Sequence, residues 1–149
     1  MTLSTRFGMV EYNEEDILTF PQGLMGLPAM KRFLILEHKP GSPFRWLQSL
    51  DEPSMSLLVC DPWAYVADYS PQLRETDETD LAMTDSEARM ILATASIPPG
   101  KPEGMTLNLL GPLVINLSKR IGKQIALDGG TYTIRHRVFQ RSRSEAVAA

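Results

Sequence analysis

The sequence Pro43-Phe44-Arg45-Trp46-Leu47-Gln48-Ser49-Leu50 sets the fold class, because its apolar and polar residues alternate, although imperfectly, as they do along a β-strand. A second stretch, Met55 to Cys60, has the composition of a buried strand and ends at Asp61-Pro62, where proline interrupts strand pairing. The short apolar run Phe33 to Leu36 precedes both of them. Together these patterns predict a protein built mainly from β-strands.

Strand patterns continue toward the C-terminus, and nearly all of them are bounded by Gly, Pro, Asn or Asp. Turns that recur about every 8–12 residues favour an antiparallel barrel or sandwich, whereas a doubly wound fold would need helices of about 10–15 residues between strands. Asp128-Gly129-Gly130 predicts a tight hairpin between two of these strands, since glycine accepts the positive φ that such a turn requires. The further strand candidates are residues 90–97, 105–110, 113–117, 124–127 and 131–138.

One segment, residues 72–88, has helical character. Thr76 is a plausible N-cap, and Asp77 and Glu78 follow in the first turn, where the helix dipole favours negative charge. The weak apolar face of this helix consists of Leu73, Leu81 and Met83. We therefore expect an all-β fold, namely a small antiparallel barrel-like domain with one short peripheral helix.

Length and composition indicate one globular domain. The chain has 149 residues, of which 43% are hydrophobic and 22% are charged, and a domain of this size buries roughly 70% of its unfolded surface. We expect a single barrel-like domain over residues 1–139 and a disordered tail over residues 140–149, whose composition is of low complexity. We see no signal peptide and no apolar run of roughly 20 residues, so we expect a cytoplasmic protein.

Charge is distributed unevenly along the chain. Residues 1–116 carry 8 Lys and Arg against 16 Asp and Glu, whereas residues 117–144 carry 7 Lys and Arg against Asp128 alone. An acidic body disfavours nucleic acid and favours a basic protein partner, mainly through steering. The basic end leaves a second hypothesis open, a small-barrel protein that binds RNA through its C-terminal strand. The residues concerned are Arg135, Arg137, Arg141 and Arg143, together with Tyr132 and Phe139.

The sequence offers little for catalysis. Cys60 is the single cysteine, and both burial and the neighbouring Asp61 would raise its pKa, which is the opposite of activation. His38 and His136 have no metal-ligand spacing, and the carboxylate clusters at residues 11–16 and 75–80 lack the glycine turn of a calcium loop. We predict no enzyme activity, no cofactor, no metal site and no small-molecule substrate; an enzyme that uses Cys60 is the weaker alternative.

The segment from Trp63 to Tyr69 is the strongest candidate for a partner-binding surface. Pro62 and Pro71 flank it, which favours an edge strand or loop, and exposed aromatic residues there can receive a partner's strand or helix. Trp46 lies within an apolar strand and is expected in the core. The candidate partner-binding residues are Trp63, Tyr65, Asp68, Tyr69, Glu75, Asp77 and Glu78.

Three amides, Asn108, Asn116 and Gln124, lie within apolar strand patterns. Buried amides need hydrogen-bond partners, so we expect these side chains to hold loops or strand register. A family signature at these positions would report the fold rather than a partner contact.

Five fragments resemble, in their order and spacing, the flagellar assembly factor FliW family. The family pattern TFPxGLxGF corresponds to Thr19–Leu27, with Leu27 where an aromatic residue is common, and SPFxWLQS corresponds to Ser42–Ser49. The other fragments are DP at Asp61-Pro62, MTxNLxxPxxIN at Met105–Asn116, and GKQ at Gly122–Gln124, so that the resemblance spans about residues 7–137. The motif residues that we expect to be structural are Phe20, Pro21, Gly23, Phe44, Trp46, Gln48, Asp61, Pro62, Asn108, Pro112, Asn116, Gly122 and Gln124.

The resemblance implies a cytoplasmic protein that binds newly made flagellin and the carbon storage regulator CsrA, a small dimeric RNA-binding repressor of the flagellin message. Binding to the regulator relieves repression, and accumulating flagellin takes the factor away and restores it. The resemblance also implies binding away from the regulator's RNA surface, an allosteric antagonism. The expected partners are flagellin and CsrA, without direct contact to nucleic acid or a membrane.

Overall fold

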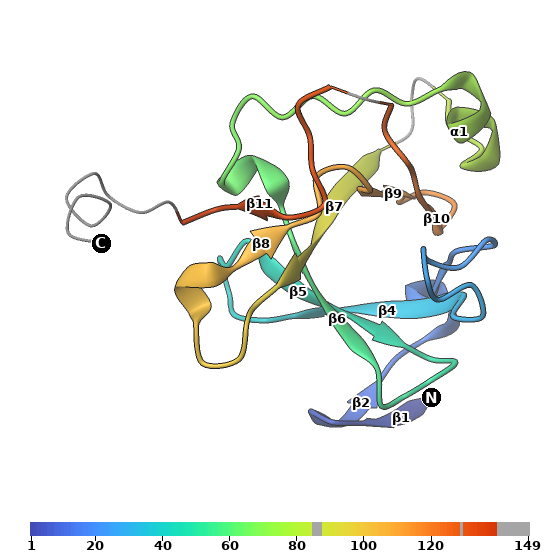
Figure 1. Cartoon of the computed structure of the whole chain (residues 1–149). Helices are drawn as coiled ribbons and strands as arrows, with labels where there is room; N and C mark the ends of the chain where they lie inside the picture. Colours follow the sequence, from blue (N-terminus) through green and yellow to red (C-terminus); the bar gives the residue numbers. More distant parts are fainter. Residues whose placement is uncertain (85–87, 129, 140–149) are drawn as a thin grey trace.

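The computed structural model describes residues 1–84, 88–128 and 130–139, and its central feature is a β-barrel (Figure 1). Within these ranges seven strands pair in the order β7-β6-β5-β4-β3-β10-β9, and β9 pairs again with β7, which closes the barrel. This arrangement confirms the predicted all-β barrel. The strands are β3 (Leu18–Thr19), β4 (Arg32–Glu37), β5 (Phe44–Ser49), β6 (Ser56–Cys60), β7 (Arg89–Ser96), β9 (Leu113–Asn116) and β10 (Ile121–Gln124).

Strand pairing around the described barrel is antiparallel except at one seam. There β3 and β10 run parallel, and Thr19 pairs with Ile121. Thr19 N donates a further hydrogen bond to Arg120 O at 2.9 Å. The barrel is therefore closed by contact between an early and a late part of the chain.

Four short strands lie outside the closed barrel, two paired in series with its edge and two in a separate hairpin. β8 (Thr106–Leu107) pairs with the end of β7, and β11 (His136–Arg137) pairs with β8. At the N-terminus, β1 (Thr2–Thr5) and β2 (Gly8–Glu11) form a separate antiparallel hairpin, which lies below the barrel in Figure 1.

The hairpin predicted around Asp128-Gly129-Gly130 does not form between the expected strands. β10 ends at Gln124 rather than Leu127, and β11 has only two residues. The two strands also have different partners, because β10 pairs with β9 and β3 whereas β11 pairs with β8. Leu127 N instead donates to Leu110 O at 2.9 Å, so this segment is held against the loop before β9. Gly129 lies outside the described residues.

Apolar side chains form one core inside the barrel and two smaller clusters outside it. Successive residues of a strand face opposite sides, so Val59 and Leu92 point inward while Cys60 and Ala93 point outward. The inner core contains Leu18, Phe20, Leu24, Met30, Phe33, Leu47, Val59, Leu92, Leu113 and Ile115. One outer cluster contains Cys60, Tyr69, Ala93, Leu107 and Leu109, and the other contains Leu81, Val114 and Ile125.

The predicted helix is shorter than expected and begins differently. α1 covers Glu75–Asp80 and is capped at Arg74 rather than Thr76, because the Asp77 carboxylate accepts a hydrogen bond from Arg74 N at 3.0 Å. The predicted apolar face is confirmed, since Leu81 is buried and Leu73 and Met83 pack against the same outer cluster. Residues 85–87, the end of the expected helix, lie outside the described ranges.

Three 3-10 turns complete the described structure: η1 (Glu14–Asp16), η2 (Pro62–Ala64) and η3 (Pro102–Gly104). No helix in the described ranges is both long enough and apolar enough to span a membrane.

Candidate functional site

The candidate partner-binding segment folds as a turn on the outside of the barrel. Pro62 occupies the first position of η2, which suits its fixed φ, and Asp61 caps the turn by accepting a hydrogen bond from Trp63 N at 3.0 Å. Of the two predicted forms, edge strand or loop, the segment adopts the loop. Its aromatic residues are therefore positioned by a capped turn rather than by strand pairing.

Trp63 and Tyr69 lie against each other, with ring centroids 5.7 Å apart, but they differ in exposure. Trp63 is 40% exposed, and its Nε1 donates to Tyr69 O at 2.8 Å, which fixes the indole at the surface. Tyr69 is only 3% exposed, and its hydroxyl donates to Leu109 O at 2.6 Å. Burial and then the neighbouring Tyr132 raise the pKa of Tyr69. Tyr69 is thus part of the outer core, and its expected place on an exposed surface is wrong.

Asp77 is likewise an internal residue. It is 5% exposed, and its carboxylate binds Lys123 Nζ at 2.7 Å in addition to capping α1 through Arg74 N. Lys123 Nζ also contacts Asp80 at 2.8 Å, so one lysine of β10 attaches the helix to the barrel. Burial raises the pKa of Asp77, but the hydrogen bonds from Lys123 and Arg74 outweigh it and hold the pKa below its usual value. The expected role of Asp77 in an exposed surface is therefore also wrong.

The remaining candidates lie at the surface. Asp68, Glu75 and Glu78 are exposed, and Tyr65 is half-buried. The Tyr65 ring contacts Phe44 at 6.1 Å and Phe139 at 5.8 Å between centroids. Phe139, which is 44% exposed, joins this aromatic group from the C-terminal end of the described chain. Sequence reasoning placed Phe139 in a basic strand and missed this contact, because nothing local relates it to Tyr65.

In the basic C-terminal segment, one of the two expected aromatic residues is turned toward the outer cluster. Tyr132, one of its expected aromatic residues, is half-buried and packs against Tyr69 at 4.8 Å. Its hydroxyl accepts a hydrogen bond from Ser70 N at 2.7 Å. Arg135 and Arg137 are exposed, and Arg141 and Arg143 lie outside the described residues.

The glycines of two motif fragments are required by close contacts. Gly23 has φ of +68°, and a Cβ there would lie 2.5 Å from Pro28 O, so the bend predicted beside Pro21 and Pro28 needs glycine. Gly122 has the Phe20 ring against it, and a Cβ at this position would lie 2.4 Å from the ring. These residues shape the barrel interior.

The motif amides hold loops, the role expected for them. Gln124 accepts from Met25 N at 2.8 Å and donates to Gly111 O at 2.9 Å, while Asn108 accepts from Gly111 N at 2.9 Å. Asn116 donates to Leu81 O at 2.9 Å and accepts from the backbone of the turn after β9. Pro112, next to Gly111, is buried and accepts from Ile125 N at 3.0 Å.

The strand that carries Phe44, Trp46 and Gln48 differs from expectation at one residue. Gln48 is buried and donates to three carbonyls of the β5–β6 turn, the nearest being Pro53 O at 2.8 Å. Trp46 is half-buried on the outer face of β5 rather than in the core, with Phe7 at 5.0 Å and the Arg6 guanidinium at 4.7 Å. The N-terminal hairpin therefore covers Trp46.

Cys60, the residue of the catalytic alternative, lies in the outer cluster that contains Tyr69 and Leu107. Cys60 is fully buried, and burial and then the Asp61 charge raise its pKa to about 12. Of the core and edge positions predicted for this cysteine, the structure shows the core position. His38 lies in the turn after β4 beside Phe44, and His136 pairs with Leu107. In the described ranges, His, Cys, Asp and Glu form no group of three that could hold a metal ion.

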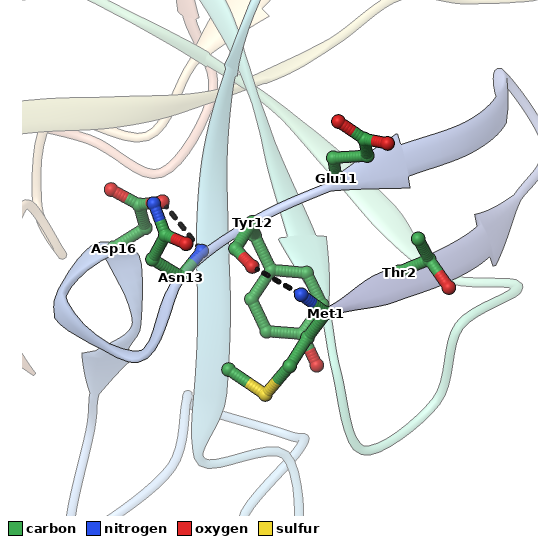
Figure 2. A pocket seen from close by; sticks show the side chains of 6 residues that line it. All are labelled: Met1, Thr2, Glu11, Tyr12, Asn13 and Asp16. Carbon is green, nitrogen blue, oxygen red and sulfur yellow. Dashed lines mark hydrogen bonds between the residues drawn. The ribbon is translucent and has the colours of Figure 1, made fainter.

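A cavity of about 470 Å³ lies between the N-terminal hairpin and η1 (Figure 2). Its polar groups largely satisfy one another, since the Met1 amine donates to Tyr12 O at 3.0 Å and Asn13 N donates to Asp16 at 2.8 Å. Glu11 borders the same space. These contacts fix the hairpin, and they do not converge on a ligand position.

Comparisons with known proteins agree on one family. The family model described as FliW protein matches residues 2–138. The flagellar assembly factor FliW of Thermosipho africanus is 37% identical over 145 residues, covering 97% of this chain and 100% of that protein. That of Magnetococcus marinus is 40% identical over 121 residues, covering 81% and 75%. A crystal structure of the flagellar assembly factor FliW superposes with a TM-score of 0.87 at 30% identity, covering 94% of this chain and 98% of the other.

Proposed function

The chain belongs to the FliW family, and from that premise we propose that it is a flagellar assembly factor that binds flagellin and antagonises the translational repressor CsrA, the carbon storage regulator. The observation that carries the proposal is the match of residues 2–138 to the family model. The aligned relatives are described as flagellar assembly factors, and they match over nearly their whole length.

The proposed mechanism is an exchange of partners in the cytoplasm. The factor binds the regulator and relieves repression of the flagellin message, and flagellin that accumulates then takes the factor away. If the factor acts away from the RNA surface, its complex with the regulator must disfavour RNA, and RNA must disfavour the factor by the same coupling free energy. No chemical step is needed, which suits a protein whose single thiol is buried.

Charge on the described surface supports a basic partner. Asp68, Glu75 and Glu78 are exposed around the Trp63 turn, and the carboxylates of η1 are exposed on the N-terminal side of the barrel. A regulator that binds RNA must itself present basic groups, and complementary potentials raise the association rate of two proteins. Our proposed surface for the regulator therefore consists of Trp63, Tyr65, Asp68, Glu75 and Glu78.

A calorimetric titration tests the proposal. The protein is titrated with the regulator of the same organism, and the titration is repeated after saturation with flagellin. The proposal expects binding in the first titration and a loss of affinity in the second. Binding to flagellin alone would leave a flagellin chaperone, and binding to neither partner would contradict the proposal.

A matched pair of variants tests the surface. Trp63→Ala with Tyr65→Ala removes the exposed aromatic area, and we expect regulator affinity to fall by at least about tenfold. Lys101→Ala, an exposed residue in the loop after β7, is the control and should leave affinity unchanged. Equal affinities for both folded variants would place the surface elsewhere.

A further inference from the structure

The N-terminal hairpin lies against the barrel without backbone pairing to it (Figure 1). β1 and β2 form a sheet of their own, and neither strand contains a buried residue. Among the described residues, the hydrogen bonds of residues 1–12 stay within that segment, such as the one from Tyr12 N to Met1 O at 2.9 Å. An isolated two-stranded hairpin is only marginally stable in water. The place of this hairpin on the barrel therefore depends on side-chain contacts.

The turn between β1 and β2 supplies the contacts with Trp46. The Phe7 ring lies 5.0 Å from the Trp46 ring, measured between centroids. The Arg6 guanidinium lies 4.7 Å from the centroid of Trp46 and 4.8 Å from that of Phe7. Arg6 and Phe7 are both exposed, and a cation–π contact is weak where the cation keeps most of its water. A cation and an apolar side chain of another protein can make the same contacts with Trp46.

The packing beneath the hairpin is incomplete. Leu34 and Leu36 alternate with Phe33 of the inner core and therefore lie on the outer face of β4. A cavity of about 140 Å³ lies between these two leucines and Val10 and Tyr12 of the N-terminal segment. Side chains that border a void lose dispersion contacts, and segments with few buried contacts open at low free energy. The hairpin thus covers this apolar face without filling it.

The covered face is one end of a continuous line of rings. Trp46 lies 6.2 Å from His38, and His38 lies 6.2 Å from Phe44, between ring centroids. Phe44 in turn lies 6.1 Å from Tyr65. Tyr65 belongs to the surface proposed above for the regulator. Opening of the hairpin would therefore extend that surface from Tyr65 to Trp46.

The chemistry of the covered site selects its occupant. Arg6 shows that the face of Trp46 accepts a guanidinium, and a tryptophan face is the best aromatic partner for a cation. The same face repels a carboxylate, because the ring quadrupole is negative there. A nucleic-acid base can stack on tryptophan, but its phosphates would meet an acidic body. A protein that presents a basic residue beside an apolar one fits best.

We propose that the N-terminal hairpin is a detachable cover, and that Arg6 and Phe7 occupy a site on Trp46 that takes a basic and an apolar side chain of the regulator. The inference rests on the regulator binding proposed above and adds Trp46 to its surface. Closure of the hairpin and occupation of Trp46 by the regulator exclude one another. The cover lowers the affinity of the factor, because only the open fraction offers the complete surface.

Variants on the two sides of the contact test the site by calorimetric titration with the regulator. Arg6→Ala with Phe7→Ala removes the cover's contacts, and we expect the Kd to fall by at least about threefold as the open fraction rises. Trp46→Leu keeps an apolar side chain and removes the cation site, and we expect the Kd to rise by at least about fivefold. Met9→Ala, at a residue of the same hairpin that is 66% exposed, is the control and should leave the Kd unchanged. A purely structural role of the hairpin would not move the Kd in opposite directions.

Hydrogen exchange of the unaltered protein tests the opening without any partner. Leu3 and Val10 pair across the hairpin, whereas Leu47 is a fully buried residue of the barrel. We expect the Leu3 and Val10 amides to exchange at least about 100-fold faster than the Leu47 amide, because a detached hairpin does not protect its own amides. Exchange at Leu3 and Val10 as slow as at Leu47 would overturn the cover.

Each binding result decides the inference. A Kd for the regulator that is unchanged or higher in Arg6→Ala with Phe7→Ala would overturn the cover while leaving regulator binding intact. If Trp46→Leu fails to fold, the double variant and hydrogen exchange decide. A single-stranded oligonucleotide whose binding is lost in Trp46→Leu would assign the site to nucleic acid and overturn the proposed occupant. Absence of regulator binding by the unaltered protein would instead overturn the proposed function, and the occupant with it.

Discussion

β10 and the segment from Asp61 to Asp80 both mix polar and apolar residues. Every motif residue of β10 makes internal contacts, whereas the residues of the segment are partly internal and partly exposed. In β10, Gly122 makes room for Phe20, while Lys123 and Gln124 bind groups on other elements. In the segment, Tyr69 and Asp77 are internal, whereas Trp63 is exposed. The contrast indicates that the motif residues of β10 make internal contacts, whereas the segment from Asp61 to Asp80 contains both internal and exposed residues.

Gly122 offers the most severe test of this contrast. In Gly122→Ala, the new Cβ would lie 2.4 Å from the Phe20 ring, and we expect a loss of about 3 kcal/mol in the free energy of unfolding because the core cannot yield that space. Gly26→Ala is the control, since its site is open although φ is +80°, and should cost about 1 kcal/mol. Urea denaturation measures both, and equal losses would contradict the role of Gly122.

Loss of the ion pair between Lys123 of β10 and Asp77 should cause the next largest loss of stability. Asp77→Asn leaves Lys123 with Asp80 alone and removes a charged cap, and we expect a loss of about 2 kcal/mol in the free energy of unfolding. Glu78→Gln, at an exposed residue of the same helix, is the control. A loss no larger than that of Glu78→Gln would show that the ion pair adds nothing to stability.

The same variant has a predicted pH dependence. The folded-state pKa of Asp77 is lowered from 3.8, so its stabilising effect is complete above that unfolded value and is lost as pH falls through the folded pKa. The pKa of Lys123 is raised from 10.5, so its contribution is lost only in more alkaline solution. The free energy of unfolding of the unaltered protein and of Asp77→Asn is measured at pH 7 and below about pH 4. The difference between the two proteins should be largest at pH 7 and smaller in acid.

Tyr69→Phe should have a smaller effect. The variant keeps the buried ring and removes the hydrogen bond to Leu109 O, so we expect a loss of about 1 kcal/mol in the free energy of unfolding. Because Tyr69 is internal, affinity for the regulator should not change in the folded protein. A calorimetric titration that shows lower affinity at unchanged stability would return Tyr69 to the binding surface.

Charge reversal at the surface should change stability least. Glu75→Lys with Glu78→Lys alters exposed residues, and although both lie in the first turn of α1, we expect less than about 1 kcal/mol of destabilisation. The association rate with the regulator should fall several-fold at low salt, and the difference should shrink as salt is added. An unchanged association rate would show that these acidic residues do not contribute to recognition of the regulator.

The features predicted correctly from the sequence are those that depend on residues close together in the chain. Strand alternation around Trp46 indicated the β-rich fold correctly, and burial of Cys60 followed from its apolar run. The proline at Pro62 left an edge strand or a loop open, and the structure shows the loop. The helix start was wrong because Asp77 caps Arg74 from within the helix, which makes Thr76 an ordinary helical residue.

The remaining errors came from contacts between distant residues. Trp46 is half-buried because the N-terminal hairpin supplies Phe7, and Tyr69 is internal because Leu109 supplies a carbonyl. The predicted hairpin near Asp128 failed because β8 competes for the later strand. None of these partners is adjacent in sequence, so no local pattern could have identified them.

The parallel seam between β3 and β10 also orders events during synthesis. Thr19 leaves the ribosome long before Ile121, its partner across the seam, and at about 5–20 residues per second the intervening hundred or so residues take roughly 5–20 s. During that interval the side of β3 that pairs with β10 has no partner strand. The barrel can therefore close only after β9 and β10, in the last third of the chain, have been synthesised.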